Sequence, residues 1–427
     1  FKIKMYDFIK KILRINRSLT GDGNRKTLKE IKKVIKKLSI KEIKSGTKVY
    51  DWKIPLEWNI KNAYIQKPDG SKICEFKKNF LHVVGYSTKI NKKLKLNQLK
   101  KHLFSLPSQP NAIPYVTSYY KKFWGFCLTD KEKKKLKPGY YKVLIDSDHS
   151  KGSMSYGEYI KKGTNKKEIL LSTYICHPTM ANNEGSGITI LTYVAKYLSK
   201  LKTKFTYRIV YSPETIGSLA YLSKNYDHLK KNIVGGYVLT CIGDEKKFSL
   251  LKSRNKNSIT DYAAEHVLNS ENKRYNLFEW DQRGSDERQY CAPKIDLPIS
   301  SIMRSKYLEY KEYHTSLDKL DKVVTAKGLR ESYEYVVKII NLLEKSYYLI
   351  STFPGEPHLG KRNLYPNISV KNNKNLNRDL LNILTWSDGK TPTFEIMNKC
   401  NLTNKQFDYL LKILQQYRLV SKSEVPI

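Results

Sequence analysis

The sequence is short of cysteine and has no long apolar run, and both shortages exclude whole classes of protein. Its six cysteines stand far apart, with no Cys-x-x-Cys pair. A chain of 427 residues can build a core without disulfides, so we expect reduced thiols. No run of about 18 apolar residues occurs, and no apolar signal region follows Phe1. We therefore expect a cytoplasmic protein with no membrane span.

Acidic residues are also scarce, because 40 Asp and Glu stand against 79 Lys and Arg, for a net charge of +39. Such a charge is typical of proteins that bind nucleic acid or an anionic surface. The lysines are spread along the chain rather than gathered in one stripe, however, and a solvated lysine surface needs no ligand. We interpret the charge as compositional bias and do not favour nucleic acid as a partner.

The order of the patterns predicts an α/β fold with an insertion. Residues 1–48 read as helical, and from about 148 to 365 strands alternate with helices. This alternation is typical of a mostly parallel sheet with helices on both faces. Residues 49–147 are strand-like, with one strand expected at His82–Tyr86, and we predict an inserted β-rich domain there. The predicted α/β domain therefore comprises residues 1–48 and 148–365.

The inserted region has a dense group of aromatic residues. They are Tyr115, Tyr119, Tyr120, Phe123, Trp124 and Phe126. Packed aromatics are common in small cores, although such rings can also form a platform for a ligand. We interpret this group as core.

The end of the chain predicts a third domain. A long amphipathic helix is expected at Gly328–Leu349, and residues 366–374 form a polar linker. Helix-like stretches follow at 376–384, 393–400 and 403–417, and then the strand-like Leu419-Val420-Ser421. Three short helices and a strand predict a winged helix-turn-helix domain over residues 372–427. Its lysines could contact phosphates, but such domains also bind proteins.

Three side chains with metal-site chemistry stand on separate loops. A strand at Glu168–Ile175 delivers His177 to its C-terminal end, where open α/β sheets bind ligands. Another strand ends just before Glu214, and His314 stands in a later polar stretch. His, carboxylate and His on separate loops are the usual make-up of a zinc hydrolase site.

Each of these residues also has a structural interpretation. A lone histidine at a strand end is often structural, and Glu214 would suit the positive end of a helix dipole. Asp286 and Glu287 lie in a charged stretch that could be a surface loop with internal ion pairs, and His314 could stand in a polar turn before a helix. Their combination carries more weight than any one of them.

Several short motifs in one order give the chain a family resemblance. The motifs are Ile113-Pro114-Tyr115, Cys176-His177-Pro178, Pro213-Glu214-Thr215-Ile216-Gly217-Ser218, Asp286-Glu287-Arg288-Gln289-Tyr290-Cys291 and Tyr313-His314-Thr315-Ser316. The sequence resembles the bacterial aminopeptidase-like proteins of the DUF4910/DUF2172 type over essentially all of its length. Those proteins carry an inserted β domain and a C-terminal winged helix, and they are distantly related to the M28 zinc aminopeptidases.

The resemblance implies a zinc site. His177 and His314 match zinc ligands, and Glu214 matches the carboxylate that serves as general base or ligand. Asp244 stands near the position of a further ligand aspartate. Asn183 stands where the family has a ligand aspartate, and this amide is a poor partner for zinc.

Three consequences of the amide at position 183 stay open. The neighbouring Glu184 could replace the missing carboxylate, the site could hold one metal, or catalysis could be lost. For the substrate, Asp286 or Glu287 could bind a free amine, with Arg288 and Tyr313 beside them.

We therefore predict a zinc-dependent hydrolase of aminopeptidase type that cleaves a peptide or amide bond. The substrate is a peptide or a small amide, and the resemblance suggests a link to surface polysaccharide metabolism. One alternative is a metal-poor binding protein of the same fold, and another is a nucleic-acid-binding regulator that uses the winged helix. A homo-oligomer is compatible with the sequence.

Overall fold

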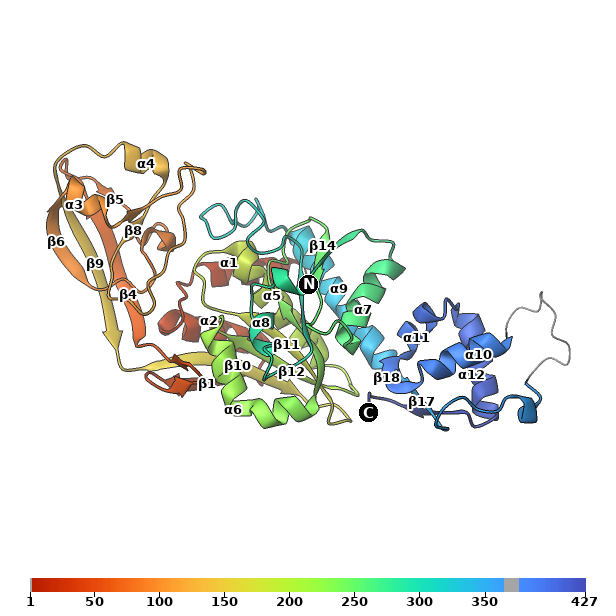
Figure 1. Ribbon diagram of the computed structural model, residues 1–427. Coiled ribbons are helices and arrows are strands. Elements are labelled where there is room, and N and C mark those ends of the chain that lie inside the picture. The colour runs from red at the N-terminus through yellow and green to blue at the C-terminus, as the bar shows by residue number, and fades with distance from the viewer. Residues whose placement is uncertain (1, 365–375) are drawn as a thin grey trace.

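The computed structural model describes residues 2–364 and 376–427, and it has an elongated shape. A β-rich part lies at one end, an α/β part in the centre and the C-terminal helices at the other end (Figure 1). Within the described residues, no helix combines the length and the apolarity that crossing a membrane requires.

An eight-stranded sheet forms the centre of the α/β part, with strand order β1-β10-β12-β11-β13-β16-β14-β15. The strands are β1 (Ser39–Lys44), β10 (Ser153–Lys161), β11 (Glu168–Tyr174), β12 (Thr206–Ser212), β13 (Ile233–Leu239), β14 (Phe248–Leu251), β15 (Tyr275–Phe278) and β16 (Ile299–Met303). The four central strands, β12, β11, β13 and β16, pair in parallel, whereas β10 and β14 join them antiparallel. Parallel central strands bring their carboxyl ends to one edge of the sheet.

Helices cover both faces of this sheet. On β11, Ile169 and Leu171 belong to one apolar cluster and Leu170 belongs to another, because successive side chains of a strand point to opposite faces. The first cluster includes residues of α1 (Lys2–Leu13), α2 (Asp22–Val34), α5 (Ser186–Leu198), α7 (Ile259–Ser270) and α9 (Ala326–Lys345). The second includes residues of α6 (Ile216–Asn232) and α8 (Glu287–Tyr290). The predicted α/β class, with helices on both faces, is confirmed.

The N-terminal region departs from its helical prediction at residues 39–44. These residues form β1, which pairs antiparallel with β10 at the edge of the sheet. The strand reads Ser-Ile-Lys-Glu-Ile-Lys, and only Ile43 is buried. A lysine-rich edge strand has no continuous apolar run, so its pattern resembles that of a solvated helix.

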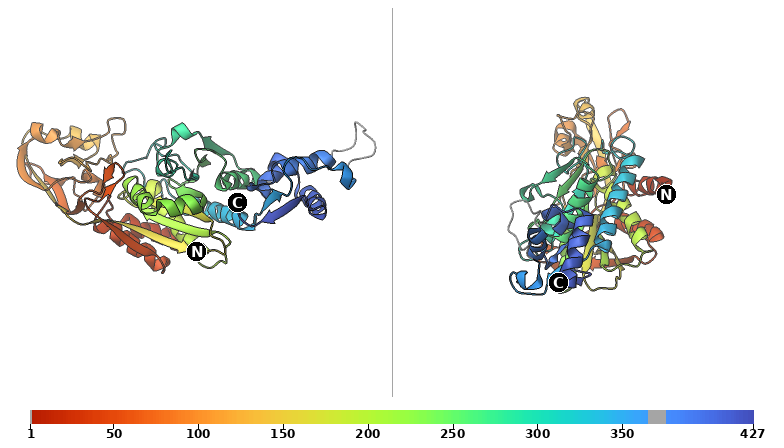
Figure 2. Two further views of the ribbon diagram at one scale, coloured as in Figure 1. Left: turned by 60° about the horizontal axis from the view of Figure 1, so that its bottom comes forward. Right: turned by 90° about the vertical axis from the view of Figure 1, so that its right-hand side faces the viewer.

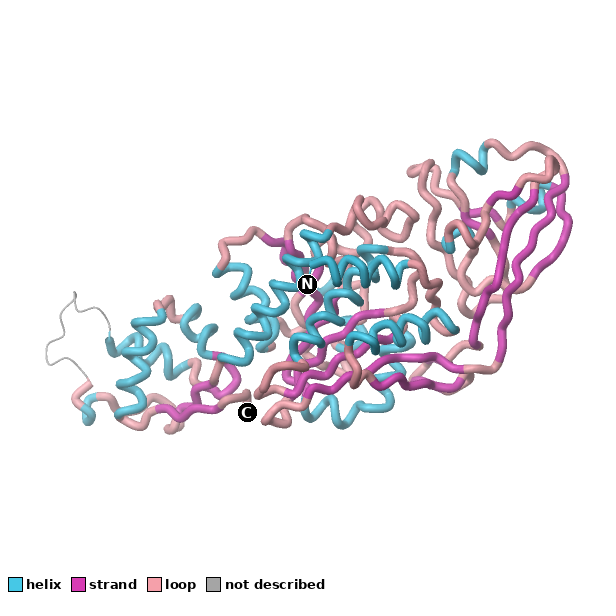
Figure 3. The backbone as a smooth tube through the Cα atoms, turned by 180° about the vertical axis from the view of Figure 1, so that it is seen from behind, coloured by secondary structure: helices cyan, strands magenta, loops and turns pink. Residues whose placement is uncertain are grey.

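A second sheet, of four strands, forms the β-rich part. Its order is β5-β4-β9-β6, from β4 (Glu57–Gln66), β5 (Lys72–Ile73), β6 (Ile90–Lys95) and β9 (Tyr140–Ser150). Strand β9 ends three residues before β10 begins, so the chain runs from this sheet into the large one (Figure 3). The strand predicted at His82–Tyr86 is wrong: a 3-10 turn at Phe80–His82 leads into isolated bridges at Val83 and Gly85.

The C-terminal part lies beyond α9 (Figure 2). Helix α9 ends at Lys345, earlier than predicted, and residues 348–351 form β17. The remaining elements are α10 (Leu376–Thr385), β18 (Asp388–Pro392), α11 (Thr393–Lys399), α12 (Asn404–Gln416) and β19 (Val420–Ser423). Strand β17 pairs between β18 and β19, a role that its apolar sequence did not distinguish from a continuing helix. The linker predicted at 366–374 lies outside the described residues, and the predicted domain boundaries stay predictions.

Candidate functional site

Two sharp turns present His177 and Glu214 at the carboxyl ends of neighbouring strands. After β11, the N–H of Met180 donates to the Pro178 carbonyl at 2.8 Å across Thr179, which has φ 58°. After β12, Ile216 N–H donates to the Glu214 carbonyl at 2.8 Å across Thr215, which has φ 63° and ψ −75°. A positive φ is strained for a β-branched residue, and strain of this kind concentrates at functional sites.

His177, Glu214 and His314 converge although 137 residues separate the first from the last. The Nε2 atom of His177 lies 3.7 Å from a carboxylate oxygen of Glu214. The ring centroids of His177 and His314 are 5.1 Å apart, and Tyr115 packs against both rings at 5.2 Å. His314 also stacks on Tyr313 at 3.9 Å between ring centroids. Three potential metal or proton-transfer groups therefore share one small volume.

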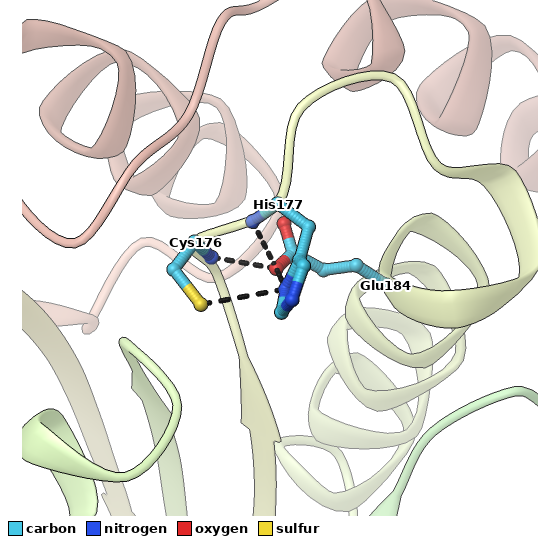
Figure 4. Close-up of side chains that lie close together, drawn as sticks. All are labelled: Cys176, His177 and Glu184. Carbon is cyan, nitrogen blue, oxygen red and sulfur yellow. Dashed lines mark hydrogen bonds and ion pairs between the residues drawn. The ribbon is translucent and has the colours of Figure 1, made fainter. Parts of the chain in front are cut away.

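The orientation of His177 is fixed by a buried carboxylate. Glu184 Oε2 accepts the backbone N–H groups of Cys176 and His177, both at 2.6 Å, and lies 3.0 Å from His177 Nδ1 (Figure 4). Its Oε1 accepts from Arg17 Nε at 2.6 Å, and both side chains of this pair are fully buried. Because Nδ1 is held by Glu184, Nε2 is the ring nitrogen of His177 that faces Glu214, the arrangement found in metal-ligating histidines.

These contacts also decide the role of Glu184. Its carboxylate and the ligating atoms of Cys176 and His177 lie within 4.8 Å of one another, a spacing that could hold a metal. The carboxylate already accepts from four donors, however, and Cys176 Sγ accepts the Glu214 N–H at 3.2 Å. We therefore assign Glu184 to orienting His177 and not to replacing a ligand aspartate.

Burial sets the protonation of the three central groups. It raises the pKa of Glu214, and together with the charge of His177 it lowers the pKa of His314 to about 2. Burial alone would lower the pKa of His177, but the hydrogen bond and charge of Glu184 raise it overall. His314 is therefore neutral near pH 7, and its Nε2 has no hydrogen-bond partner among the described residues.

A cavity of about 480 Å³ opens beside these groups. It is lined by Leu19, Trp52, Tyr115, Thr117, Tyr119, Tyr120, Cys176, His177, Glu214, Thr215, Ile216, Arg288, Gln289 and His314. Of the aromatic group interpreted as core, Phe126 is core, whereas Tyr115, Tyr119 and Tyr120 line the cavity. The sequence held no signal for this difference, because rings of both kinds stand close together in one short stretch.

Asn183 is fully buried and is not among the residues that line the cavity. Its Nδ2 donates to the Tyr174 hydroxyl at 2.9 Å, and its backbone N–H donates to Asp318 at 2.9 Å. Its Oδ1 is buried and accepts from no donor in the described chain. Burying an acceptor without a donor is costly, so this oxygen is available to a cation.

Asp244 and Glu287 lie away from the cavity. Asp244 accepts from Asn182 Nδ2 and from the backbone N–H groups of residues 246 and 305, which ties two loops together. Glu287 accepts from the N–H groups of Gly284 and Ser285 and from the hydroxyls of Ser301 and Tyr307. These bonds leave neither carboxylate for a metal or a substrate amine, so we drop both from the predicted site.

Asp286 supports the strained turn instead of lining the cavity. Its Oδ1 accepts from the Thr215 N–H at 2.8 Å and from Ser218 Oγ at 3.0 Å. Burial and the charge of Glu214 raise its pKa to about 7. Arg288, two residues on, does line the cavity and donates to Thr215 Oγ1 at 2.8 Å. Asp286 therefore supports this turn through the backbone of Thr215, and Arg288 contacts it through the Thr215 side chain.

We expect Asp286→Ala to lower kcat/KM by about tenfold to a hundredfold, because the turn that aims Glu214 loses its acceptor and small misplacements are costly in catalysis. Asp286→Asn retains an oxygen acceptor for the Thr215 N–H and should keep most of the activity. Steady-state kinetics of both variants check this. Equal losses in the two variants would show that the charge matters and not the support of the turn.

The family model described as a domain of unknown function (DUF4910) matches residues 6–346, and a winged helix-turn-helix model matches residues 347–422. A Clostridium acetobutylicum protein, described as a polysaccharide biosynthesis protein with an aminopeptidase-like domain, is 41% identical over 419 residues, which cover 98% of this chain and 96% of the relative.

Solved structures share the fold. A crystal structure of a peptidase from Clostridium acetobutylicum has a TM-score of 0.84 at 39% identity, covering 99% of this chain and 96% of that one. The zinc aminopeptidase BSAP from Bacillus subtilis has a TM-score of 0.59 at 10% identity, covering 79% and 94%. At that identity the likeness shows a common fold alone. The DUF4910 membership and the C-terminal winged helix expected from the sequence motifs are confirmed.

Proposed function

Since the chain belongs to the DUF4910 family, we propose that it is a metal-dependent hydrolase that cleaves a peptide or amide bond, with zinc as the metal. The convergence of two imidazoles and a carboxylate from three separate loops in one cavity carries this proposal. The aminopeptidase-like fold supports it, and the description of the relative as a polysaccharide biosynthesis protein favours an amide carried on a sugar.

The donor atoms fit a single zinc ion. His177 and His314 would hold it through Nε2, and Asn183 would add its Oδ1 oxygen. Two of these atoms, His314 Nε2 and Asn183 Oδ1, are buried without partners in the described residues, which a cation would relieve. A neutral amide in place of a carboxylate lowers the charge of the site, so one metal is favoured over two.

The chain's own residues supply the proton transfers. A zinc ion, when bound, lowers the pKa of water to about 7 and polarises a carbonyl. Glu214 faces His177 at 3.7 Å and makes no other close polar contact with its carboxylate among the described residues, so it can accept a proton from the attacking water. Glu214 then passes that proton to the nitrogen of the leaving amine as the C–N bond breaks.

We expect the purified protein to contain about one zinc per chain and His314→Ala to lose most of it, because this ring contributes a ligand and no hydrogen bond to the fold. Metal analysis by mass spectrometry checks this, with His102→Ala as control, since His102 stacks on Trp124 in the β-rich part. A metal-free native protein, or full metal content in the His314 variant, contradicts the proposed zinc site. Either result favours a metal-poor binding protein of the same fold, which the neutral amide of Asn183 would be compatible with.

A further inference from the structure

The charges that line the cavity do not match a substrate with a free amine. Among the described lining residues, Glu214 is the one carboxylate and Arg288 is the one arginine, and no lysine lines the cavity. The other carboxylates nearby do not line the cavity. Asp286 accepts from the Thr215 N–H through Oδ1, although its Oδ2 has no partner among the described residues, and Glu287 accepts from four donors. A substrate ammonium would therefore have to pair with Glu214, the residue that is needed to accept the proton from the attacking water.

Arg288 has the features of an anion-binding residue. The guanidinium donates to Thr215 Oγ1 at 2.8 Å. In the described part of the chain no carboxylate lies within ion-pair distance of it, although its charge acts to lower the pKa values of Glu214 and Asp286. The side chain is exposed at the cavity wall rather than folded into the protein. A guanidinium has five N–H donors in a planar fork that matches a carboxylate, so most of its donors remain for a ligand.

Aromatic rings form the wall beside this arginine. The hydroxyls of Tyr115 and Tyr119 lie 2.9 Å apart, which holds the two rings in place. Tyr120 and Trp52 lie at the outer edge with ring centroids 6.2 Å apart, and they are 56% and 42% exposed. Exposed rings of this size on a cavity wall suit the flat face of a ring in the substrate.

Resting on the proposed hydrolase function, we propose that the substrate is an N-acylated compound with a carboxylate and no free ammonium group. Arg288 binds the carboxylate, and the rings of Trp52, Tyr115, Tyr119 and Tyr120 hold the body of the substrate. Water adds to the acyl carbon, the C–N bond breaks, and the products are a carboxylic acid and an amine that takes up the proton carried by Glu214. The enzyme is thus a deacylase of acidic amides and not an aminopeptidase.

Binding of three matched probes to full-length protein tests this inference. N-acetylphenylalanine has a carboxylate and no ammonium, its amide N-acetylphenylalaninamide is neutral, and phenylalaninamide has a free ammonium. Calorimetry uses the Glu214→Gln background, which prevents turnover during the titration. We expect N-acetylphenylalanine to bind roughly tenfold or more tightly than either of the others, since a hydrogen-bonded charge pair supplies that difference.

A second substitution in the same background isolates the arginine. Arg288→Gln should remove the preference for N-acetylphenylalanine, whereas Arg283→Gln should leave it, because Arg283 packs on Trp280 and does not line the cavity. Tighter binding of phenylalaninamide, equal binding of all three probes, no binding of any at millimolar concentration, or a preference that survives Arg288→Gln would each overturn the inference.

Hydrolysis by the unmodified protein separates the two proposals. Release of acetate from N-acetylphenylalanine, with little release of nitroaniline from phenylalanine p-nitroanilide, supports both. Arg288-dependent binding without hydrolysis of either compound supports the acidic ligand but contradicts both the hydrolase and the deacylase reaction. Efficient release of nitroaniline that does not depend on Arg288 supports the hydrolase and contradicts the acidic substrate.

Discussion

Glu214→Gln should lower the hydrolysis rate by about 10²–10⁴-fold while the fold and the bound metal stay intact. Glutamine has the shape of glutamate but cannot accept the proton from the attacking water. The carboxylate of Glu214 makes no hydrogen bond that the described fold needs, since its nearest polar partner is His177 at 3.7 Å. The loss should therefore fall on kcat, with little change in thermal stability.

The pH dependence of the unmodified enzyme adds a second measurement of the same residue. Burial raises the pKa of Glu214 from its ordinary value of 4.5. A general base works in its deprotonated form, so activity should fall as the pH drops through this raised pKa, and the acid limb of kcat/KM should lie above pH 4.5. If the residual activity of the Glu214→Gln variant shows the same acid limb of kcat/KM, a group other than Glu214 is responsible for that limb.

Metal content decides between two roles for Glu214. Retained zinc with lost turnover makes it the base, and lost zinc makes it a ligand. Glu334→Gln is a matched control, because Glu334 is 53% exposed on α9 and lies outside the cavity. Unchanged activity in the Glu214 variant would remove this residue from the mechanism.

The sequence was sufficient to predict the site residues that directly follow strands. His177 and Glu214 each stand just after a β-branched or apolar run, and parallel strands bring such positions together at one edge of a sheet. The turn geometry was not visible, because the positive φ angles of Thr179 and Thr215 contradict the local preference of threonine. At Thr215 this conformation is supported by Asp286, which accepts the backbone N–H.

Partners that are distant in sequence could not be predicted from local patterns. Arg17 stands 167 residues from Glu184, and no periodicity links them. Asp244, near a strand end, and Glu287 carried the right chemistry. Their carboxylates nevertheless accept from N–H groups of their own loops and from side chains elsewhere in the fold. Which way a loop carboxylate points depends on the donors around it, and those donors come from tertiary structure.

Arg17→Met should destabilise the protein by about 3–5 kcal/mol, because the variant leaves the fully buried Glu184 carboxylate without its counter-charge. The Arg17 guanidinium also donates to the Ile12 carbonyl at the end of α1, so the loop before α2 loses a second contact. Since Glu184 orients His177, zinc affinity should fall along with stability. Urea unfolding and zinc titration of the same variant measure the two effects.

A double variant shows whether the unpaired charge causes the loss. Arg17→Met combined with Glu184→Gln removes both charges and keeps an oxygen acceptor for the N–H groups of Cys176 and His177, so part of the stability should return. Arg330→Met is the control, because Arg330 forms a partly exposed pair with Glu334 at 3.8 Å and its loss should cost under about 1 kcal/mol. If Arg17→Met costs no more than Arg330→Met, the buried pair does not hold the loop that carries His177, and the orientation of this histidine must depend on the strand alone.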